Sequence, residues 1–270
     1  MVVSRALLLG VMPKAVVVIP CFNEAARFQA AGFEALGASG QLDVLFVDDG
    51  STDNTGQIVD VFCAAHGSGF QALHLRSNVG KGEAVRRGVL TALERNPVIV
   101  GYADADLSAP PAEILRLLSI SGASPAGVEA VIGSRVRMLG AVIDRRALRH
   151  YAGRIFATVA SMLLNLPVYD TQCGVKFFRD TPSLRAALAE PFLSRWIFDV
   201  ELLGRLTIGA DAAARERVIE APLRRWRDVP GSKIRPGHWP RVAVDLMRIA
   251  ADFKRRKQNR GDNSSSAILS

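Results

Sequence analysis

The sequence predicts an α/β fold with a mostly parallel central sheet flanked by helices. Short apolar runs rich in β-branched residues alternate with segments of helical composition, which is typical of strand–helix–strand units. A polar cluster follows each of these runs, as expected where parallel strands present functional loops at their carboxyl ends. With 270 residues, the chain is long enough to bury a full hydrophobic core.

The expected elements follow one another in order. Strands are expected at 15–19, 43–47, 71–75 and from residue 98, and each is a short apolar run. Helices are expected between them at 25–36, 55–65 and 83–93, because parallel strands need a crossover connection. In the second half we expect a strand at 132–135, a helix at 144–166 and a mobile loop over the active site at 224–233.

Composition restricts the partners and the compartment. A net charge of +8 and a pI near 9.9 favour an anionic partner. Nucleic acid is disfavoured, because the chain has no zinc-finger spacing and no basic sheet motif interleaved with aromatic residues. The three cysteines, Cys21, Cys63 and Cys173, form no disulfide framework. No segment is long and apolar enough to span a bilayer, so we expect a cytoplasmic protein with at most peripheral contact at the inner face of a membrane.

Two carboxylates, Asp104 and Asp106, end the apolar run that begins at Val98. Side chains alternate along an extended chain, so both can point the same way from the end of a strand. Like charges held this close favour a bound cation, and Mg²⁺ or Mn²⁺ suits carboxylates combined with phosphates. The alternative is a solvated acidic turn before a helix that starts near Pro111.

Two further clusters suit a nucleotide. Asp48 and Asp49 can accept hydrogen bonds from a base and from ribose hydroxyls, although turn and N-cap roles are equally compatible with them. Lys81 lies between two glycines, which suits close approach to a phosphate but also suits a plain surface turn. The chain has no Gly-x-Gly-x-x-Gly after the first strand and no Walker loop, so dinucleotide and ordinary ATP sites are disfavoured.

Four motifs occur in a fixed order: Val-Val-Val-Ile-Pro-Cys-Phe-Asn-Glu at 16–24, Val-Asp-Asp-Gly-Ser-Thr-Asp-Asn-Thr at 47–55, Asn-Val-Gly-Lys-Gly at 78–82 and Asp-Ala-Asp at 104–106. Together they resemble family-2 glycosyltransferases of the GT-A nucleotide-sugar fold. The resemblance implies that Asp104 and Asp106 hold the metal ion on the donor diphosphate. It assigns a further set of residues to the nucleotide: Pro20, Asn23, Glu24, Asp48, Asp49, Lys81 and Asp104.

Two segments in the second half of the chain point to a subgroup of this family. Residues 169–178 and 195–202 resemble dolichyl-phosphate β-glucosyltransferases and related polyprenyl-phosphate glycosyltransferases. The Gln-x-x-Arg-Trp signature of processive polysaccharide synthases is absent, because Arg195-Trp196 lacks the glutamine. The resemblance therefore implies an inverting transfer of a hexose, with UDP-glucose as the expected donor and a polyprenyl or dolichyl phosphate as the expected acceptor.

Basic residues and carboxylates in the second half of the chain are candidates for binding and orienting the acceptor. Arg135, Arg146 and Lys233 are candidates for binding the acceptor or a phosphate. Asp170 is the first candidate for a base or an acceptor-orienting carboxylate. Asp199 is the second, and an ion pair with a nearby arginine is its favoured alternative.

Two amphipathic segments could contact lipid. In the helix expected at 144–166, apolar residues share one face near several arginines, which suits a prenyl tail and a phosphate or, alternatively, a buried packing helix. After a catalytic domain at 1–235, a basic amphipathic helix is expected at 236–258, lying on anionic lipid or docked on the domain. Residues 259–270 are polar and are expected to be disordered.

Three other functions stay open at this point. A family-2 enzyme could use a sugar or protein hydroxyl as its acceptor. A nucleotidyltransferase on a related fold would release pyrophosphate in place of a nucleoside diphosphate. A non-catalytic nucleotide-sugar binder would bind without turnover.

Overall fold

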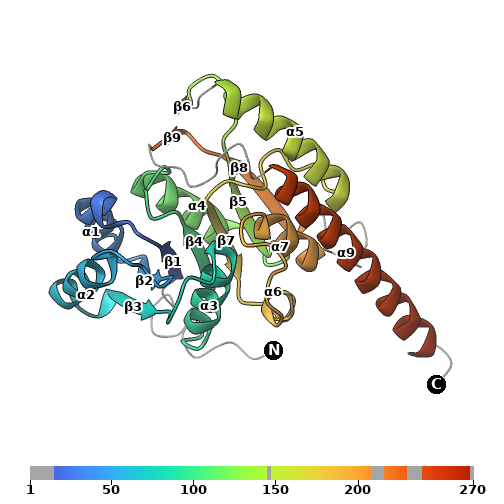
Figure 1. Cartoon of the computed structure of the whole chain (residues 1–270), viewed down its shortest axis with the longest axis horizontal. Helices are drawn as coiled ribbons and strands as arrows, with labels where there is room; N and C mark the ends of the chain where they lie inside the picture. The colour runs from blue at the N-terminus through green and yellow to red at the C-terminus, as the bar shows by residue number, and fades with distance from the viewer. Residues whose placement is uncertain (1–14, 145–146, 208–215, 230–238, 268–270) are drawn as a thin grey trace.

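A computed structural model of the chain describes residues 15–144, 147–207, 216–229 and 239–267 (Figure 1). Seven strands form one sheet, in the order β3 (Phe70–His74), β2 (Leu42–Asp48), β1 (Ala15–Cys21), β4 (Ile99–Ala103), β7 (Val175–Arg179), β5 (Ala130–Ser134) and β8 (Val218–Pro222). Strand β7 runs antiparallel to both of its neighbours, whereas the other described neighbours in this sheet pair in parallel. The predicted α/β class with a mostly parallel sheet is confirmed.

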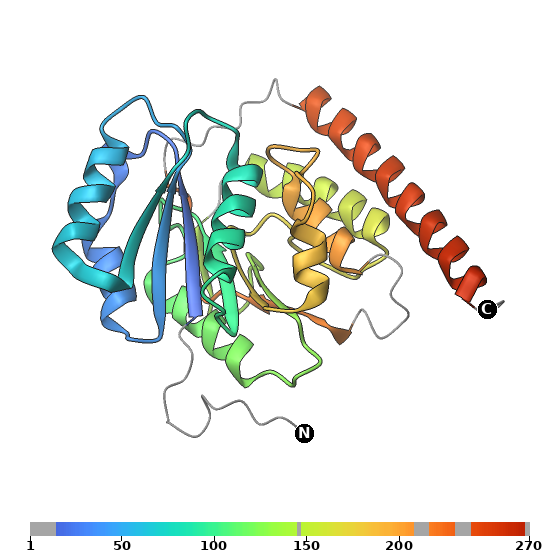
Figure 2. The same cartoon turned by 90° about the horizontal axis from the view of Figure 1, so that it is seen from below.

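Helices cover both faces of the sheet. On one face lie α1 (Ala30–Ala38), α2 (Thr55–His66) and α4 (Pro111–Ala123), and on the other lie α3 (Lys81–Leu93), α6 (Pro182–Leu188) and α7 (Phe198–Thr207). Side chains of β1 alternate between the two cores, with Val17 on the first and Val16 and Val18 on the second. Figure 2 shows the first strands between the blue helices α1 and α2 and the teal helix α3.

The helix predicted at 25–36 is interrupted. A single 3-10 turn, η1 (Ala25–Arg27), comes first, and α1 begins only at Ala30. Polar contacts keep this turn separate from α1, since Ala25 N donates to Asp53 and the Arg27 guanidinium pairs with Glu24. A second 3-10 turn, η2 (Gly67–Gly69), follows α2.

The predictions for 144–166 and 224–233 also need correction. Residues Val142–Asp144 form strand β6, and helix α5 (Ala147–Leu164) starts after it. Arg225–Arg227 form strand β9, which pairs in parallel with β6, so this part of the predicted mobile loop is wrong. The backbone hydrogen bonds at this ribbon include Val142 N to Arg224 O at 2.8 Å. The rest of that predicted loop, from residue 230, lies outside the described residues.

The C-terminal helix α9 (Trp239–Ala267) packs on the rest of the described structure, beside α7 and at the far end of the molecule from α1 and α2 (Figure 1). Ile249 and Phe253 are buried in a third core that also contains Ile197. Gly204 of α7 makes this approach possible, because a Cβ there would lie 1.9 Å from Phe253 Cζ. Of the two alternatives for this helix, docking on the domain is therefore observed.

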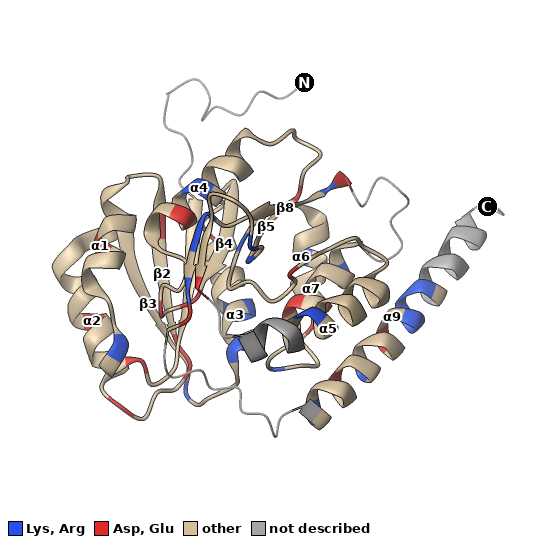
Figure 3. Cartoon of the chain, turned by 90° about the horizontal axis from the view of Figure 1, so that it is seen from above, with Lys and Arg blue, Asp and Glu red and all other residues tan. Residues whose placement is uncertain are grey.

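Helix α9 extends to Ala267, whereas the sequence suggested an end at 258 and a disordered tail. Adding residues to an existing helix costs little compared with nucleating one, so polar residues can prolong it. Its second half carries basic residues (Figure 3), of which Lys254, Arg255 and Lys257 are exposed. No helix in the described part of the chain has an apolar stretch that could cross a bilayer.

Candidate active site

The order of the strands places the candidate residues along one edge of the sheet. Strand β1 lies between β2 and β4, so the strand order reverses there and a crevice is expected at the carboxyl ends. In the parallel register Cys21 pairs with Asp48, and Val18 pairs with Tyr102, two residues before Asp104. The loops that follow β1, β2 and β4 therefore meet at this edge.

The loop after β1 is tied to the loop after β2. Asn23 Oδ1 accepts a hydrogen bond from Thr52 N at 2.8 Å, and Asn23 N donates to Ser51 Oγ at 2.9 Å. Asn23 has a φ of 52°, a left-handed conformation that asparagine tolerates better than most residues. Glu24 N donates to Thr55 Oγ1 at 2.7 Å. Asn23 and Glu24 thus fix the two loops to each other, and Pro20 lies within β1 next to them.

Asp49 connects the same edge to the Gly-Lys-Gly loop. Its two carboxylate oxygens accept hydrogen bonds from Val79 N at 2.7 Å and from Gly80 N at 2.9 Å. Burial raises the pKa of Asp49 above its ordinary value, and these two backbone hydrogen bonds only partly offset burial. Gly80 has a φ of 96°, which only glycine adopts readily, and it precedes Lys81 at the start of α3. Asp49 therefore helps to set the position of Lys81.

Asp48 is held from two sides. Its Oδ1 accepts a hydrogen bond from Ser51 N at 3.0 Å, and its Oδ2 lies 3.3 Å from His74 Nδ1. His74 Nε2 in turn lies 2.8 Å from Asp60 Oδ1. His74 thus lies between two carboxylates, one of which is a predicted nucleotide contact.

We expect the His74→Asn variant to lose stability relative to the wild type mainly at acidic pH. Burial lowers the pKa of His74, but the hydrogen bonds to Asp60 and Asp48 outweigh it and leave the pKa raised. Such a histidine stabilises the fold fully below its unfolded pKa of about 6.5 and loses this contribution as the pH rises through the folded pKa. Urea denaturation of both proteins at about pH 6 and about pH 9 measures the difference. An equal loss at both pH values would contradict this expectation.

Lys81 and Asp104 form the charged centre of the edge. Lys81 Nζ donates to Asp104 Oδ1 at 2.5 Å, and about a third of each side chain is exposed (30% and 33%). Burial lowers the pKa of Lys81, but Asp104, Asp199 and Asp106 outweigh burial and raise it. Lys81 therefore stays protonated and supplies one fixed positive charge beside two acidic residues.

Asp106 is held by its own turn. Its Oδ1 accepts hydrogen bonds from Ser108 N at 3.0 Å and from Ser108 Oγ at 2.7 Å. Leu107, between them, has a φ of 48°, and its N donates to Asp104 O at 3.1 Å. This tight turn brings the chain back toward Asp104.

The two carboxylates suit a divalent cation. Asp104 Oδ2 and Asp106 Oδ2 have no hydrogen-bond donor within the described residues, so each can offer a hard oxygen ligand. Among those residues no group of three or more acidic, histidine or cysteine side chains could hold a metal ion by itself. Mg²⁺ is typically held by one or two carboxylates together with water and substrate phosphates, and this pair fits that pattern.

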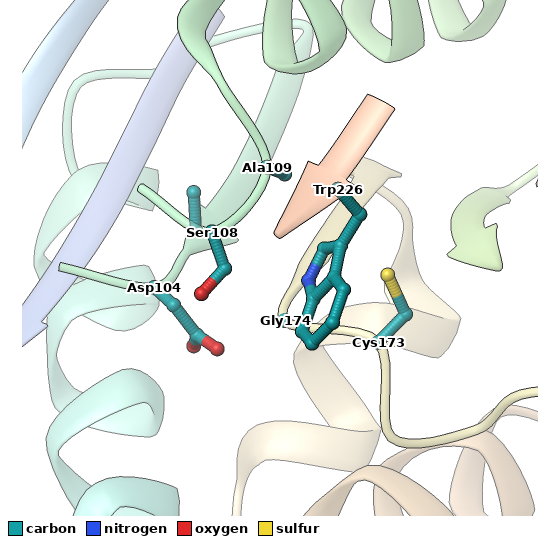
Figure 4. A pocket seen from close by; sticks show the side chains of 7 residues that line it. Asp104, Ser108, Ala109, Cys173, Gly174 and Trp226 are labelled. Carbon is teal, nitrogen blue, oxygen red and sulfur yellow. The ribbon is translucent and has the colours of Figure 1, made fainter. Parts of the chain in front are cut away.

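A small pocket lies beside Asp104 (Figure 4). Its lining combines Asp104 and Ser108 with small and aromatic residues: Ala103, Ala109, Cys173, Gly174 and Trp226. Gly174 leaves space for the Asp104 carboxylate, because a Cβ there would lie 2.0 Å from Asp104 Oδ2 and would displace it. Burial and the nearby Asp170 raise the pKa of the Cys173 thiol to about 12, so this thiol is no nucleophile at neutral pH.

A buried charged network lies beneath this pocket. The Lys176 ammonium pairs with Asp199 and donates to Cys173 O at 2.6 Å, and Tyr102 OH also donates to Asp199. Lys176 and Tyr102 are fully buried, and Asp199 is 5% exposed. Asp199 was predicted as a second candidate base or an ion-pair partner. The geometry favours the ion pair, with a lysine in place of the expected arginine.

Arg135 and Asp170 form a second pair next to the pocket. Arg135 Nε and Nη2 donate to the two oxygens of Asp170 at 2.6 and 2.8 Å, so the pair is bidentate. Burial lowers the pKa of Arg135, but Asp170 outweighs burial and raises it. Glu220 accepts hydrogen bonds from Tyr169 N and Asp170 N, both at 2.7 Å, and so anchors this segment. The contacts of Asp170 suit orientation of Arg135 better than proton abstraction.

The remaining residues predicted for the acceptor side have different outcomes. Arg146 and Lys233 lie outside the described residues, so the structure does not place them. Arg154 is one of the arginines near the apolar face expected at 144–166. Its guanidinium lies over the ring of Tyr169, 3.8 Å from the ring centroid. On α5, Ile155, Val159 and Met162 are exposed by 71%, 44% and 77%, so these three residues of the predicted apolar face do not pack in a core, whereas Leu166 of the same predicted face is buried.

Sequence reasoning missed three residues at the site: Tyr102, Lys176 and Trp226. Lys176 had a usable signal, because a lysine inside the apolar run 175–178 needs a buried partner. Tyr102 had none, since its role depends on a contact with a distant segment. Trp226 belongs to the segment 224–233 that was expected over the active site, but its own place in the pocket depends on distant contacts.

Comparison with known proteins agrees with this arrangement. Residues 16–180 match the family described as glycosyl transferase family 2. The dolichyl-phosphate beta-glucosyltransferase of Saccharomyces cerevisiae is 32% identical over 261 residues, which covers 88% of this chain and 72% of that protein. The polyprenol monophosphomannose synthase of Mycolicibacterium smegmatis is 29% identical over 192 residues, with 71% of each chain covered.

Solved structures share the fold. A glucosyl-3-phosphoglycerate synthase from Mycobacterium tuberculosis, in complex with Mn²⁺, UDP-glucose and phosphoglyceric acid, superposes with a TM-score of 0.61 at 19% identity. The match covers 88% of this chain and 80% of that chain. At this identity the likeness concerns the fold, which is of the GT-A type.

Proposed function

Because the chain belongs to glycosyl transferase family 2, we propose that it is a metal-dependent, inverting hexosyltransferase that moves glucose from UDP-glucose to a polyprenyl phosphate. The relatives named for dolichyl-phosphate and polyprenol-phosphate transfer support a lipid phosphate as the acceptor. The glucosyl-3-phosphoglycerate synthase that shares the fold was solved with Mn²⁺ and UDP-glucose, which supports the choice of donor and of cation.

The observation that carries this proposal is the pair of Lys81 and Asp104 at the edge where the strand order reverses. A nucleotide diphosphate placed there meets the Lys81 cation, and its base and ribose extend over the loops of Asn23 and Asp48. Asp49 has both oxygens occupied by backbone N–H groups, so we assign it the task of holding the Gly80–Lys81 corner in place.

Asp104 and Asp106 would hold Mg²⁺ or Mn²⁺ in the loaded enzyme. When bound, the cation supplies positive charge to the departing diphosphate. Lys81 contributes a second positive charge at the same place, fixed by its ion pair before the substrate arrives. Gly174 keeps the backbone of the neighbouring loop close to the Asp104 carboxylate without filling its space.

The acceptor needs little help to become a nucleophile. A phosphate monoester has a second pKa of about 6 and is largely ionised at neutral pH, so no strong base is required. We therefore assign Asp170 to orienting Arg135, whose guanidinium lies over the ring of Trp226, a residue that lines the pocket. Arg135 can hold the acceptor phosphate opposite the leaving group, which is the arrangement that inverts the anomeric carbon.

The exposed face of α5 suits the lipid part of the acceptor. Ile155, Val159 and Met162 lie exposed on one side of the helix, and Arg154 is close to them in sequence. An apolar helix face with nearby basic residues suits contact with a prenyl tail and with a membrane surface. We propose this face as the peripheral membrane contact of the protein.

The test uses the purified chain, radiolabelled UDP-glucose, Mn²⁺ and vesicles that contain a polyprenyl phosphate. The expected products are a glucose-labelled lipid phosphate and UDP in equal amounts. Matched vesicles with the unphosphorylated polyprenol are expected to give no labelled lipid. Labelled product from a hydroxyl acceptor, release of pyrophosphate in place of UDP, or UDP binding without turnover would overturn the proposal. GDP-mannose in place of UDP-glucose tests the sugar and the nucleotide.

A further inference from the structure

Trp226 forms the wall of the pocket opposite Asp104 and comes from a distant part of the chain (Figure 4). It lies at the middle of strand β9, where its register partner on β6 is Ile143. Arg227 N donates to Ser108 O at 3.1 Å, which fastens β9 to the turn that follows the two aspartates. The indole is therefore held beside the aspartate turn by backbone contacts.

The indole packs against Arg135 and against the first hydrophobic core, but it is not fully buried. The Arg135 guanidinium lies over the ring, 5.4 Å from its centroid, and the Arg135–Asp170 pair fixes that guanidinium. Trp226 is only half-buried, and its Nε1 has no hydrogen-bond acceptor within the described residues. A buried tryptophan N–H usually has a hydrogen-bond partner, and a ligand that covers this half-buried ring can supply one.

The opposite wall of the pocket is small and polar. Ala103, Ala109 and Gly174 contribute small side chains or none, while Asp104 contributes its carboxylate and Ser108 its hydroxyl. An apolar ring facing a few hydrogen-bonding groups is the lining that a pyranose requires, because a sugar presents C–H groups on its faces and hydroxyls at its rim. A plain hydrocarbon tail would offer no partner to Asp104 Oδ2, which accepts no hydrogen bond from the described residues.

We propose that Trp226 binds the hexose of the donor, with its ring against the C–H face of the sugar and its Nε1–H donating to a sugar hydroxyl. This inference rests on the proposed function, which puts the diphosphate at Lys81 and Asp104. The sugar is joined directly to that diphosphate, and the pocket wall next to Asp104 is Trp226. Trp226 is then a residue that determines affinity for the sugar and leaves the nucleotide unaffected.

The experiment compares UDP with UDP-glucose. Calorimetry in the presence of Mn²⁺ gives Kd for both ligands in the wild type and in the Trp226→Leu and Trp226→Phe variants. We expect Trp226→Leu to weaken UDP-glucose binding about tenfold and to change UDP binding by less than about twofold. Trp226→Phe keeps a ring but loses the N–H donor, so its loss for UDP-glucose should be intermediate. Trp196→Phe, at a residue that does not line the pocket, is the matched control and should leave the ratio of the two constants unchanged.

Other outcomes separate the two proposals. Equal losses for UDP and UDP-glucose would overturn the inference, because Trp226 would then act on the nucleotide or on Asp104. A higher KM for the lipid phosphate with unchanged donor constants would also overturn it and would assign Trp226 to the acceptor. A wild type that binds neither UDP nor UDP-glucose would overturn the proposed function itself.

A second readout does not depend on substitution at the pocket. The chain has three tryptophans, so the Trp196→Phe/Trp239→Phe variant leaves Trp226 as the sole tryptophan. Its fluorescence should change more with UDP-glucose than with UDP. Equal changes with the two ligands would contradict contact with the sugar.

Discussion

The Asp106→Ala variant is expected to transfer glucose at least about 100-fold more slowly than the wild type, the scale for removing one group that stabilises transition-state charge. Alanine removes the Oδ2 oxygen that we assign to the cation, and it also removes the Oδ1 acceptor of the Ser108 hydrogen bonds. The rate is measured as labelled lipid formed at saturating donor and acceptor. Weaker binding of UDP in the presence of Mn²⁺ should accompany the loss of rate.

The Asp106→Asn variant separates charge from geometry. Asparagine keeps an oxygen for the Ser108 hydrogen bonds but has no negative charge to hold a cation. We expect Asp106→Asn to be nearly as slow as Asp106→Ala. A rate near that of the wild type in the asparagine variant would show that the residue only shapes the turn, and the assignment to the metal would fail.

The Lys176→Met variant is expected to lose about 3–5 kcal/mol of unfolding free energy, the range for breaking a buried ion pair by removing one partner. Methionine has a similar length, but among the described residues it leaves the buried Asp199 carboxylate with Tyr102 as its one side-chain hydrogen-bond donor. Cys173 O also loses the hydrogen bond that Lys176 donates at 2.6 Å. Urea denaturation followed by circular dichroism measures the loss.

Two controls make this measurement specific. In the Lys176→Met/Asp199→Leu variant no buried charge is left alone, so much of the lost stability should return. The exposed Arg87 pairs at 2.9 Å with the largely buried Glu83, which also pairs with Arg86. This contact is the comparison for an exposed cation, and Arg87→Met should cost less than about 1 kcal/mol. If the double variant were as unstable as the sum of its single changes, an unpaired charge would not explain the loss.

Elements with a local signal were predictable from the sequence. The first strands are apolar runs bounded by turn residues, and the structure places them within one or two residues of the expected bounds. The polar clusters after them meet at one edge because parallel strands leave their carboxyl ends together. Asp104 and Lys81 could therefore be assigned to a shared site from the sequence, and the structure shows them in contact.

Features that depend on distant contacts were not predictable in this way. Strand β9 forms by pairing with β6, which lies more than eighty residues earlier in the chain. Its three residues, Arg-Trp-Arg, give no strand signal by themselves. Asp199 looked like a helix residue near an arginine, but its partner Lys176 comes from strand β7. Trp226 reaches the pocket only because β9 is fastened to Ser108.

The measurement that tests the central claim most directly is a crystal structure with Mn²⁺ and UDP, in which anomalous scattering locates the metal. We predict one strong peak within coordination distance of carboxylate oxygens of both Asp104 and Asp106, bridged to the diphosphate of UDP, with Lys81 beside the same phosphates. UDP bound at another edge of the sheet, or a manganese peak that neither carboxylate touches, would contradict the account.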